Sequence, residues 1–149
     1  LGSEFESLML QQAAQIIVDA HQNGLFVVLW IYPRGKSVSN DQDIHTIAGC
    51  AGVGMALGAD FVKVTYPYED DPKVSAENFQ EVITAAGRTG VLCVGGSKQD
   101  PEKYLEYVRE QMNTAGARGI AVGRNVYQQP LEQAIELASK LTAIVEGKK

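Results

Sequence analysis

Two kinds of hydrophobic pattern alternate along the chain. In the longer segments apolar residues recur every three or four positions, which is typical of amphipathic helices. The shorter segments are continuous apolar runs, which are typical of buried strands. Glycine and proline residues separate the segments. The pattern predicts the order α, β, α, β, α, β, α, β, α.

The first helix is predicted over residues 6–22, with Asn23-Gly24 as its C-terminal stop. The strands are separated, centre to centre, by roughly 30 residues, which is the length of a βαβ unit. The predicted strands span residues 25–32, 61–66, 91–95 and 119–122. The other predicted helices span residues 45–57, 76–86, 101–115 and 130–145.

Because the strands are almost continuously apolar, we expect both faces of a parallel sheet to be covered. Strands that alternate with helices then leave two architectures, a doubly wound sheet or part of a (β/α)8 barrel. A whole barrel takes about 250 residues, whereas this chain of 149 residues has only four βα units. If the sheet belongs to a barrel, residues 1–149 are a single segment that forms half of it and has two free sheet edges.

The composition narrows the class of function. Hydrophobic residues make up 45% of the chain and charged residues 21%, with 13 Lys and Arg against 18 Asp and Glu. No basic cluster suits a nucleic acid, although an anionic small molecule needs only two or three local cations. No apolar run reaches the roughly 18 residues of a membrane-spanning helix, so we expect a cytoplasmic protein without a membrane partner. Cys50 and Cys93 are far apart in the chain, and His21 and His45 are its two histidines. This set argues against a structural metal site.

Lys63 is the most informative residue, because it lies in the middle of the predicted strand 61–66 between two valines. A buried ammonium group is unfavourable unless something compensates it. We therefore expect Lys63 to reach water at a strand end, to pair with a carboxylate, or to lose its proton and act as a nucleophile that forms a Schiff base.

Tyr32 ends the predicted strand 25–32, just before a proline and a glycine that turn the chain. Strand alternation places Val28, Trp30 and Tyr32 on one face, so the indole and the phenol are predicted to point together into the interior or into a pocket at its mouth. There the phenol either transfers a proton or is a core tyrosine whose hydroxyl bonds a backbone carbonyl.

Turns that carry glycine follow the last two predicted strands, at Gly95-Gly96-Ser97-Lys98 and at Gly123-Arg124. Glycine lets backbone N–H groups approach an anion closely, and a following helix start together with Lys98 and Arg124 would add positive charge. The alternative is that each turn only reverses the chain. A third glycine group, Gly49, Gly52 and Gly54, falls inside the predicted helix 45–57 and indicates close helix packing rather than a dinucleotide loop.

Four motifs together resemble one family. In chain order they are WIYPRG at 30–35, GADFVKV at 58–64, GGSK at 95–98 and GIAVGRNVYQ at 119–128. Their order and spacing are similar to those of the archaeal-type class I fructose-1,6-bisphosphate aldolases. The resemblance implies a (β/α)8 barrel in which these strands are the fifth to the eighth, and a homo-oligomer. It also implies reversible cleavage of fructose 1,6-bisphosphate to dihydroxyacetone phosphate and glyceraldehyde 3-phosphate in glycolysis and gluconeogenesis, without a metal or cofactor.

The resemblance also assigns residues to roles. Lys63 would form the Schiff base, and Tyr32 would donate and accept the proton in carbon–carbon cleavage. Trp30 would form a pocket wall, and Arg34 would contact the far phosphate. The phosphate of the dihydroxyacetone half would be bound by Gly95, Gly96, Ser97, Gly123 and Arg124.

An aspartate near the first strand of that family has no counterpart here, so the resemblance implies a C-terminal half that is inactive without the N-terminal half of the barrel. A related alternative is a transaldolase-like 2-amino-3,7-dideoxy-heptulosonate synthase of aromatic amino-acid biosynthesis, which shares the lysine, the tyrosine and similar phosphate loops. An alternative of another class is a sugar-phosphate-binding or assembly module without turnover.

Overall fold

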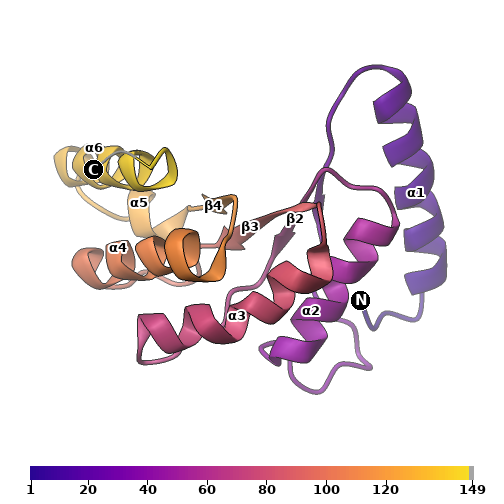
Figure 1. Ribbon diagram of the computed structural model, residues 1–149, viewed down its shortest axis with the longest axis horizontal. Coiled ribbons are helices and arrows are strands. Elements are labelled where there is room, and N and C mark those ends of the chain that lie inside the picture. Colours follow the sequence, from indigo (N-terminus) through magenta and orange to yellow (C-terminus); the bar gives the residue numbers. More distant parts are fainter. Residues whose placement is uncertain (148–149) are drawn as a thin grey trace.

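A computed structural model describes residues 1–147, in which helices and strands alternate (Figure 1). The strands form one parallel sheet in the order β1-β2-β3-β4, which confirms the predicted α/β class. The strands are β1 (Val28–Trp30), β2 (Phe61–Val64), β3 (Gly90–Val94) and β4 (Gly119–Ala121). The helices are α1 (Glu6–Gln22), α2 (Ile44–Ala56), α3 (Pro72–Ala86), α4 (Pro101–Glu110), the π-helical η1 (Gln111–Ala115), α5 (Arg124–Tyr127) and α6 (Leu131–Val145). Within residues 1–147 no helix is both long enough and apolar enough to cross a membrane.

The strand register places four residues side by side across the sheet. Trp30 pairs with Lys63, Lys63 pairs with Leu92, and Leu92 pairs with Gly119. Because side chains alternate between the two faces of a strand, these residues share one face, and their sequence neighbours such as Val62 point to the other.

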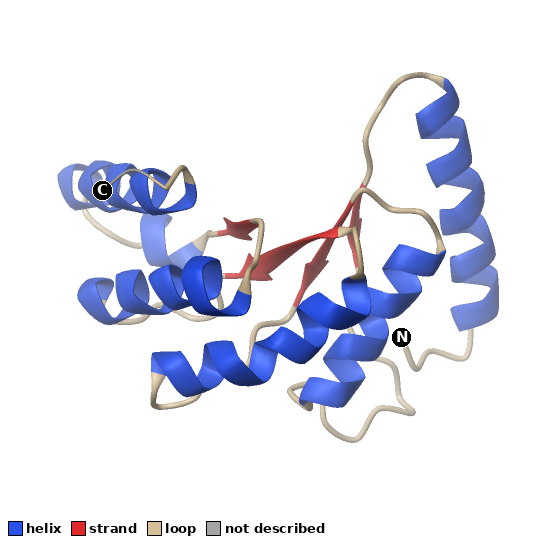
Figure 2. Ribbon diagram, viewed as in Figure 1, coloured by secondary structure: helices blue, strands red, loops and turns tan. Residues whose placement is uncertain are grey.

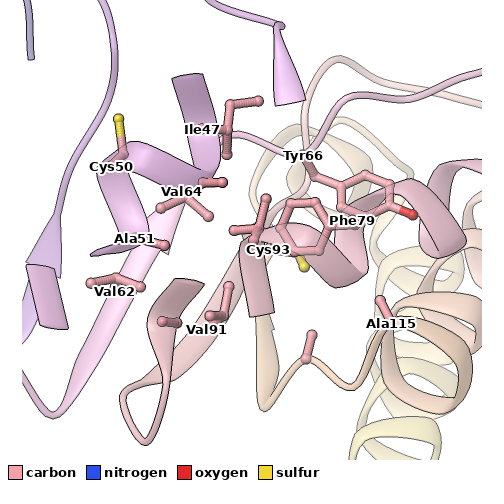
Figure 3. Close-up of a cluster of buried hydrophobic side chains, with 14 of the residues drawn as sticks. Ile47, Cys50, Ala51, Val62, Val64, Tyr66, Phe79, Val91, Cys93 and Ala115 are labelled. Carbon is pink, nitrogen blue, oxygen red and sulfur yellow. The ribbon is translucent and has the colours of Figure 1, made fainter. Parts of the chain in front are cut away.

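Helices α2 and α3 pack on one face of the sheet (Figure 2). Val62 and Val64 on that face are 0% exposed, and Val91 and Cys93 are 2% and 1% exposed. Figure 3 shows the apolar residues of the two helices that complete this core, Ile47, Ala51 and Phe79. Burial of these side chains is the main favourable contribution to the fold.

The other face of the sheet is only partly covered, so the prediction that both faces are covered is wrong for these residues. Phe61, Lys63, Leu92 and Val94 are all half-buried, and Trp30 is 67% exposed. Figure 2 shows no helix lying across the middle of this face. The sequence pattern could not show this, because a strand that is apolar on both faces has the same composition whether or not a partner covers it.

The strands are shorter than predicted at several ends. The prediction started β1 at residue 25, but Leu25 is 62% exposed and Phe26 is 71% exposed. The backbone N–H of Val27 donates to the Asp60 carboxylate at 2.7 Å, and the sheet pairing begins at Val28. A side chain therefore takes the place of a ladder partner before β1 begins.

Helix α3 begins four residues before its predicted start at residue 76. The Asp71 carboxylate accepts hydrogen bonds from the N–H groups of Lys73 and Val74, and Pro72 occupies the first turn. This is the usual combination of an N-cap carboxylate with an early proline. The acidic cluster Glu69-Asp70-Asp71 that precedes the helix thus includes its cap.

The predicted helix 101–115 is divided at Glu110, where the α-helical part α4 passes into the π-helical η1. The short helix α5 was not predicted, since four residues are too few to show a helical period. Helices α1 and α6 lie close to their predicted bounds.

Gly54 lets α2 approach β2 closely. A Cβ at this position would overlap Cγ1 of the fully buried Val62. We expect Gly54→Ala to lower the free energy of unfolding by about 1–3 kcal/mol, because the extra methyl group over-packs the core. Chemical denaturation measures the change.

Gly49 provides a matched control on the same helix. It is exposed, and a Cβ there would have no atom within 4 Å. Gly49→Ala should raise the free energy of unfolding by about 0.5–1 kcal/mol through helix propensity. Equal effects of the two substitutions would contradict the close packing assigned to Gly54.

Candidate active site

Lys63 lies on the partly covered face of β2, beside its register partner Trp30. Its Nζ atom is 3.5 Å from the centroid of the Trp30 indole ring, which is a cation–π contact. The two valines beside Lys63 in sequence do not enclose its amine, because Val62 and Val64 are buried on the opposite face of the strand. An aromatic ring, rather than an aliphatic shell, therefore positions this amine.

Tyr32 follows β1, near the edge of the sheet where all four parallel strands end. Burial raises the pKa of its phenol, and the Arg34 guanidinium opposes this by lowering it. The Arg34 Cζ atom lies 4.8 Å from the centroid of the tyrosine ring, and Arg34 Nε is 3.7 Å from the Asp41 carboxylate. Tyr32 is half-buried, whereas Trp30 is largely exposed.

A groove of about 540 Å³ runs between α1 and β1. Trp30, Tyr32 and Arg34 line it, together with apolar residues of α1 such as Met9. Lys63 reaches this group through its contact with the Trp30 ring. The structure thus brings together four of the residues predicted from the first two motifs.

The turn after β3 and the turn after β4 meet at the carboxyl edge of the sheet. Gly95 N–H donates to Ala121 O at 3.1 Å, and the Asn125 side chain donates to Gly95 O at 2.6 Å and to Ser97 O at 3.1 Å. The predicted phosphate residues Gly95, Gly96, Ser97, Gly123 and Arg124 are therefore neighbours in space.

The charges at these turns differ from the prediction in part. Arg124 is exposed, as an anion-binding side chain requires. Lys98 donates to Gln128 O at 2.9 Å and so lies across the two turns. The start of α4 does not contribute, because the Asp100 carboxylate already accepts its N–H groups at Glu102 and Lys103.

Two tyrosines that the sequence did not assign to the site brace the first glycine turn. Tyr68 donates its hydroxyl to Val94 O at 3.0 Å, and its ring lies 3.0 Å from where a Cβ would stand on Gly96, whose φ is +64°. The Tyr104 hydroxyl lies 2.8 Å from the Cβ position of Gly95. Burial raises the pKa of both phenols, that of Tyr104 to about 12, so both stay protonated near neutral pH.

Among residues 1–147 no three His, Cys, Asp or Glu side chains gather to hold a metal ion. His21 pairs with Asp60 at 2.9 Å and His45 pairs with Glu81 at 2.6 Å, both on the surface. The described part of the site offers an amine, a phenol, an arginine and glycine turns. That set is suited to amine catalysis on a phosphorylated carbonyl compound.

Comparisons with known proteins place these features in a family. The family model described as DeoC/LacD family aldolase matches residues 1–129. The chain belongs to the DeoC/LacD family of aldolases, which confirms the aldolase resemblance at this level. The chain spans about half the length of the curated relatives it matches.

Two relatives show the range of named activities. A fructose-bisphosphate aldolase/6-deoxy-5-ketofructose 1-phosphate synthase of Methanocaldococcus jannaschii is 53% identical over 148 residues, which are 99% of this chain and 47% of that protein. A 2-amino-4,5-dihydroxy-6-oxo-7-(phosphonooxy)heptanoate synthase of Streptomyces griseus is 32% identical over 148 residues, with 99% of this chain and 50% of that protein covered.

Two solved structures share the fold. The fructose-bisphosphate aldolase from Slackia heliotrinireducens superposes with a TM-score of 0.89 at 48% identity, covering 97% of this chain and 46% of that one. An archaeal fructose-1,6-bisphosphate aldolase whose catalytic lysine is covalently bound to the carbinolamine intermediate superposes with a TM-score of 0.82 at 38% identity, covering 97% and 54%.

The contact between Arg34 and Tyr32 predicts a measurable shift. The cation lowers the pKa of the phenol by favouring the phenolate, so Arg34→Gln should raise the pKa of Tyr32 further. Titration of the tyrosine ring carbons by NMR measures this pKa. Arg88→Gln, at an exposed arginine beyond α3, is the matched control and should leave it unchanged. A Tyr32 pKa that does not rise in Arg34→Gln would contradict the stacking.

Proposed function

We propose that this chain supplies the Schiff-base lysine of a class I fructose-1,6-bisphosphate aldolase, with Lys63 as the nucleophile. The observation that carries the proposal is the position of the Lys63 amine. The amine lies on the open sheet face over the Trp30 ring. Its strand, β2, pairs with β3, which ends in the first glycine turn. The archaeal neighbour with a covalently bound catalytic lysine supports it.

We propose further that residues 1–149 form one segment, the second half of a (β/α)8 barrel, with these strands as the fifth to the eighth. Strands β1 and β4 each pair on one side only within the described sheet. The sheet face that would line the barrel is partly open and carries the exposed Trp30. A first half would pair with both free edges and cover this face. The homo-oligomer and the cytoplasmic location stay predictions from the sequence.

In the proposed reaction the neutral Lys63 amine attacks the ketone carbon of fructose 1,6-bisphosphate, and the carbinolamine loses water to give an iminium ion. Tyr32, which becomes a phenolate when it gives its proton to the departing carbinolamine hydroxyl, then takes the proton of the C4 hydroxyl while the C3–C4 bond breaks. The bonding electrons move into the iminium to form an enamine, and glyceraldehyde 3-phosphate leaves. Protonation at C3 and hydrolysis release dihydroxyacetone phosphate and restore the amine.

The other site residues would bind the substrate ends. Gly95, Gly96 and Ser97, with Gly123 and Arg124, would hold the phosphate of the dihydroxyacetone half. Arg34, whose guanidinium is exposed and contacts Asp41, would exchange that contact for the far phosphate. The Trp30 ring faces the Lys63 ammonium and would equally favour the iminium cation that replaces it.

A second candidate activity is the condensation carried out by the synthase relatives, and the match to the Streptomyces griseus protein over 148 residues favours keeping it. It would use the same amine to form an enamine from a phosphorylated ketone. Comparison of turnover with the two substrate sets separates the activities. A sugar-phosphate-binding module without turnover would show neither.

Borohydride trapping tests the nucleophile. We reconstitute the enzyme by mixing this chain with the part of the Methanocaldococcus jannaschii relative that it does not match. Reduction in the presence of dihydroxyacetone phosphate should attach the ketone phosphate to the peptide that contains Lys63, as read by mass spectrometry. Lys63→Met should abolish the adduct.

Lys73→Met, at an exposed lysine on α3, is the matched control and should retain the full adduct. Tyr32→Phe should also retain the adduct but lower the rate of cleavage by about 10²–10⁴-fold, because only the proton transfer is lost. An adduct on another lysine would overturn the assignment, and the absence of any adduct would favour the binding module.

The chain alone is expected to be inactive. Without a first half, water reaches the open face around Lys63, and no acidic residue from the first strand is present. Cleavage of fructose 1,6-bisphosphate is measured in a coupled assay before and after addition of the complementary segment. Activity of purified residues 1–149 without added protein would refute this prediction.

A further inference from the structure

Asn125 is the buried polar residue that joins the two glycine turns. Its side chain is 1% exposed, and all of its hydrogen-bonding partners lie in the turn after β3. The Nδ2 atom donates to Gly95 O at 2.6 Å and to Ser97 O at 3.1 Å, while Oδ1 accepts from Gln99 N–H at 2.8 Å. One amide therefore fixes three backbone groups that lie 26 to 30 positions away in sequence.

These bonds set the direction of neighbouring N–H groups. In a trans peptide the carbonyl oxygen and the following N–H point in opposite directions, and no described peptide bond is cis. Because Gly95 O and Ser97 O point at Asn125, the N–H groups of Gly96 and Lys98 point away from it. Asn125 is buried, whereas Gly96 is partly exposed and Lys98 is exposed, so the side of the turn away from Asn125 is the exposed side.

Those N–H groups are also unused by the protein. Within residues 1–147, the backbone N–H groups of Gly96, Ser97, Lys98 and Gly123 donate to no protein acceptor. Several free N–H groups on one short turn form a concave anion-binding arrangement. These N–H groups keep their directions only if the peptide planes of the turn keep their orientation. A glycine pair has little conformational preference of its own, so another group must hold those planes.

We propose that Asn125 is a positioning residue for phosphate binding: by holding Gly95 O and Ser97 O, it aims the N–H groups of Gly96 and Lys98 at the phosphate of the substrate. The inference deepens the proposed function, on which it rests for the identity of the ligand. Asn125 itself does not touch the phosphate, because its donors are occupied by the two carbonyl oxygens.

The test compares two ketones that differ only in the phosphate. In the reconstituted enzyme, borohydride trapping on Lys63 is measured against dihydroxyacetone phosphate and against unphosphorylated dihydroxyacetone. Asn125→Ala should raise the concentration of dihydroxyacetone phosphate for half-maximal trapping by about 10- to 100-fold, since charge-assisted hydrogen bonds to the phosphate are lost. Trapping with dihydroxyacetone should change by less than about twofold, which also shows that the variant is folded.

Asn113→Ala is the matched control, at an exposed asparagine on η1, and should leave both values unchanged. An equal loss with both ketones would overturn the inference, since Asn125 would then support the fold as a whole. An unchanged value with dihydroxyacetone phosphate would overturn it as well.

A second measurement separates this inference from the proposed function. The chain is labelled with ¹⁵N in the reconstituted enzyme and titrated with inorganic phosphate, and the amide signals of Gly96 and Lys98 are followed. They should shift in the unsubstituted protein and not in Asn125→Ala. Shifts without a borohydride adduct on Lys63 would uphold the phosphate site and defeat the aldolase. An adduct without shifts at these amides would defeat the role of Asn125 alone.

Discussion

The parallel register of the sheet is the constraint on which the rest of the structure depends. With Trp30, Lys63, Leu92 and Gly119 at one level, every neighbouring position must point to the opposite face. The complete burial of Val62 under the helices therefore also fixes where Lys63 stands. A slip of one residue in β2 would bury the ammonium among valines and expose the core, so the hydrophobic face holds the amine in position without contacting it.

A different kind of interaction organises the loops at the carboxyl edge. Polar groups from distant parts of the chain hold these loops: Asn125 binds the turn at Gly95, and Tyr68 binds Val94 O. Such bonds have strict geometry, and the low polarity around them makes a broken one costly. The hydrophobic core thus sets the strand positions, while buried polar side chains set the backbone directions that ligand binding needs.

Features that depend on the local hydrophobic period were predicted correctly from the sequence. Features that depend on a hydrogen-bonding partner far away in the chain were missed. Helix α1 was predicted to the residue because both its stripe and its stop are local. The start of β1 was missed because Val27 N–H bonds to Asp60, 33 positions away in the chain. Lys63 and Tyr32 were chosen as candidate site residues from residue type and motif, and their roles stay predictions. Asn125 gave no signal, since a single asparagine after an arginine is typical of many loops and its partners are known only once the turns meet.

The open face connects the proposed chemistry with the proposed assembly. A lysine acts as a nucleophile only as the neutral amine, and removal of water is the general way to favour that form. In the described structure the Lys63 amine has the Trp30 indole on one side, and the sheet face on which it lies is only partly covered. Desolvation must therefore come from elsewhere. In a closed barrel the opposite strands would supply it, and the same enclosure would strengthen every hydrogen bond to the substrate. The four strands alone fix the amine in space, whereas its proposed reactivity would require a surface that covers them.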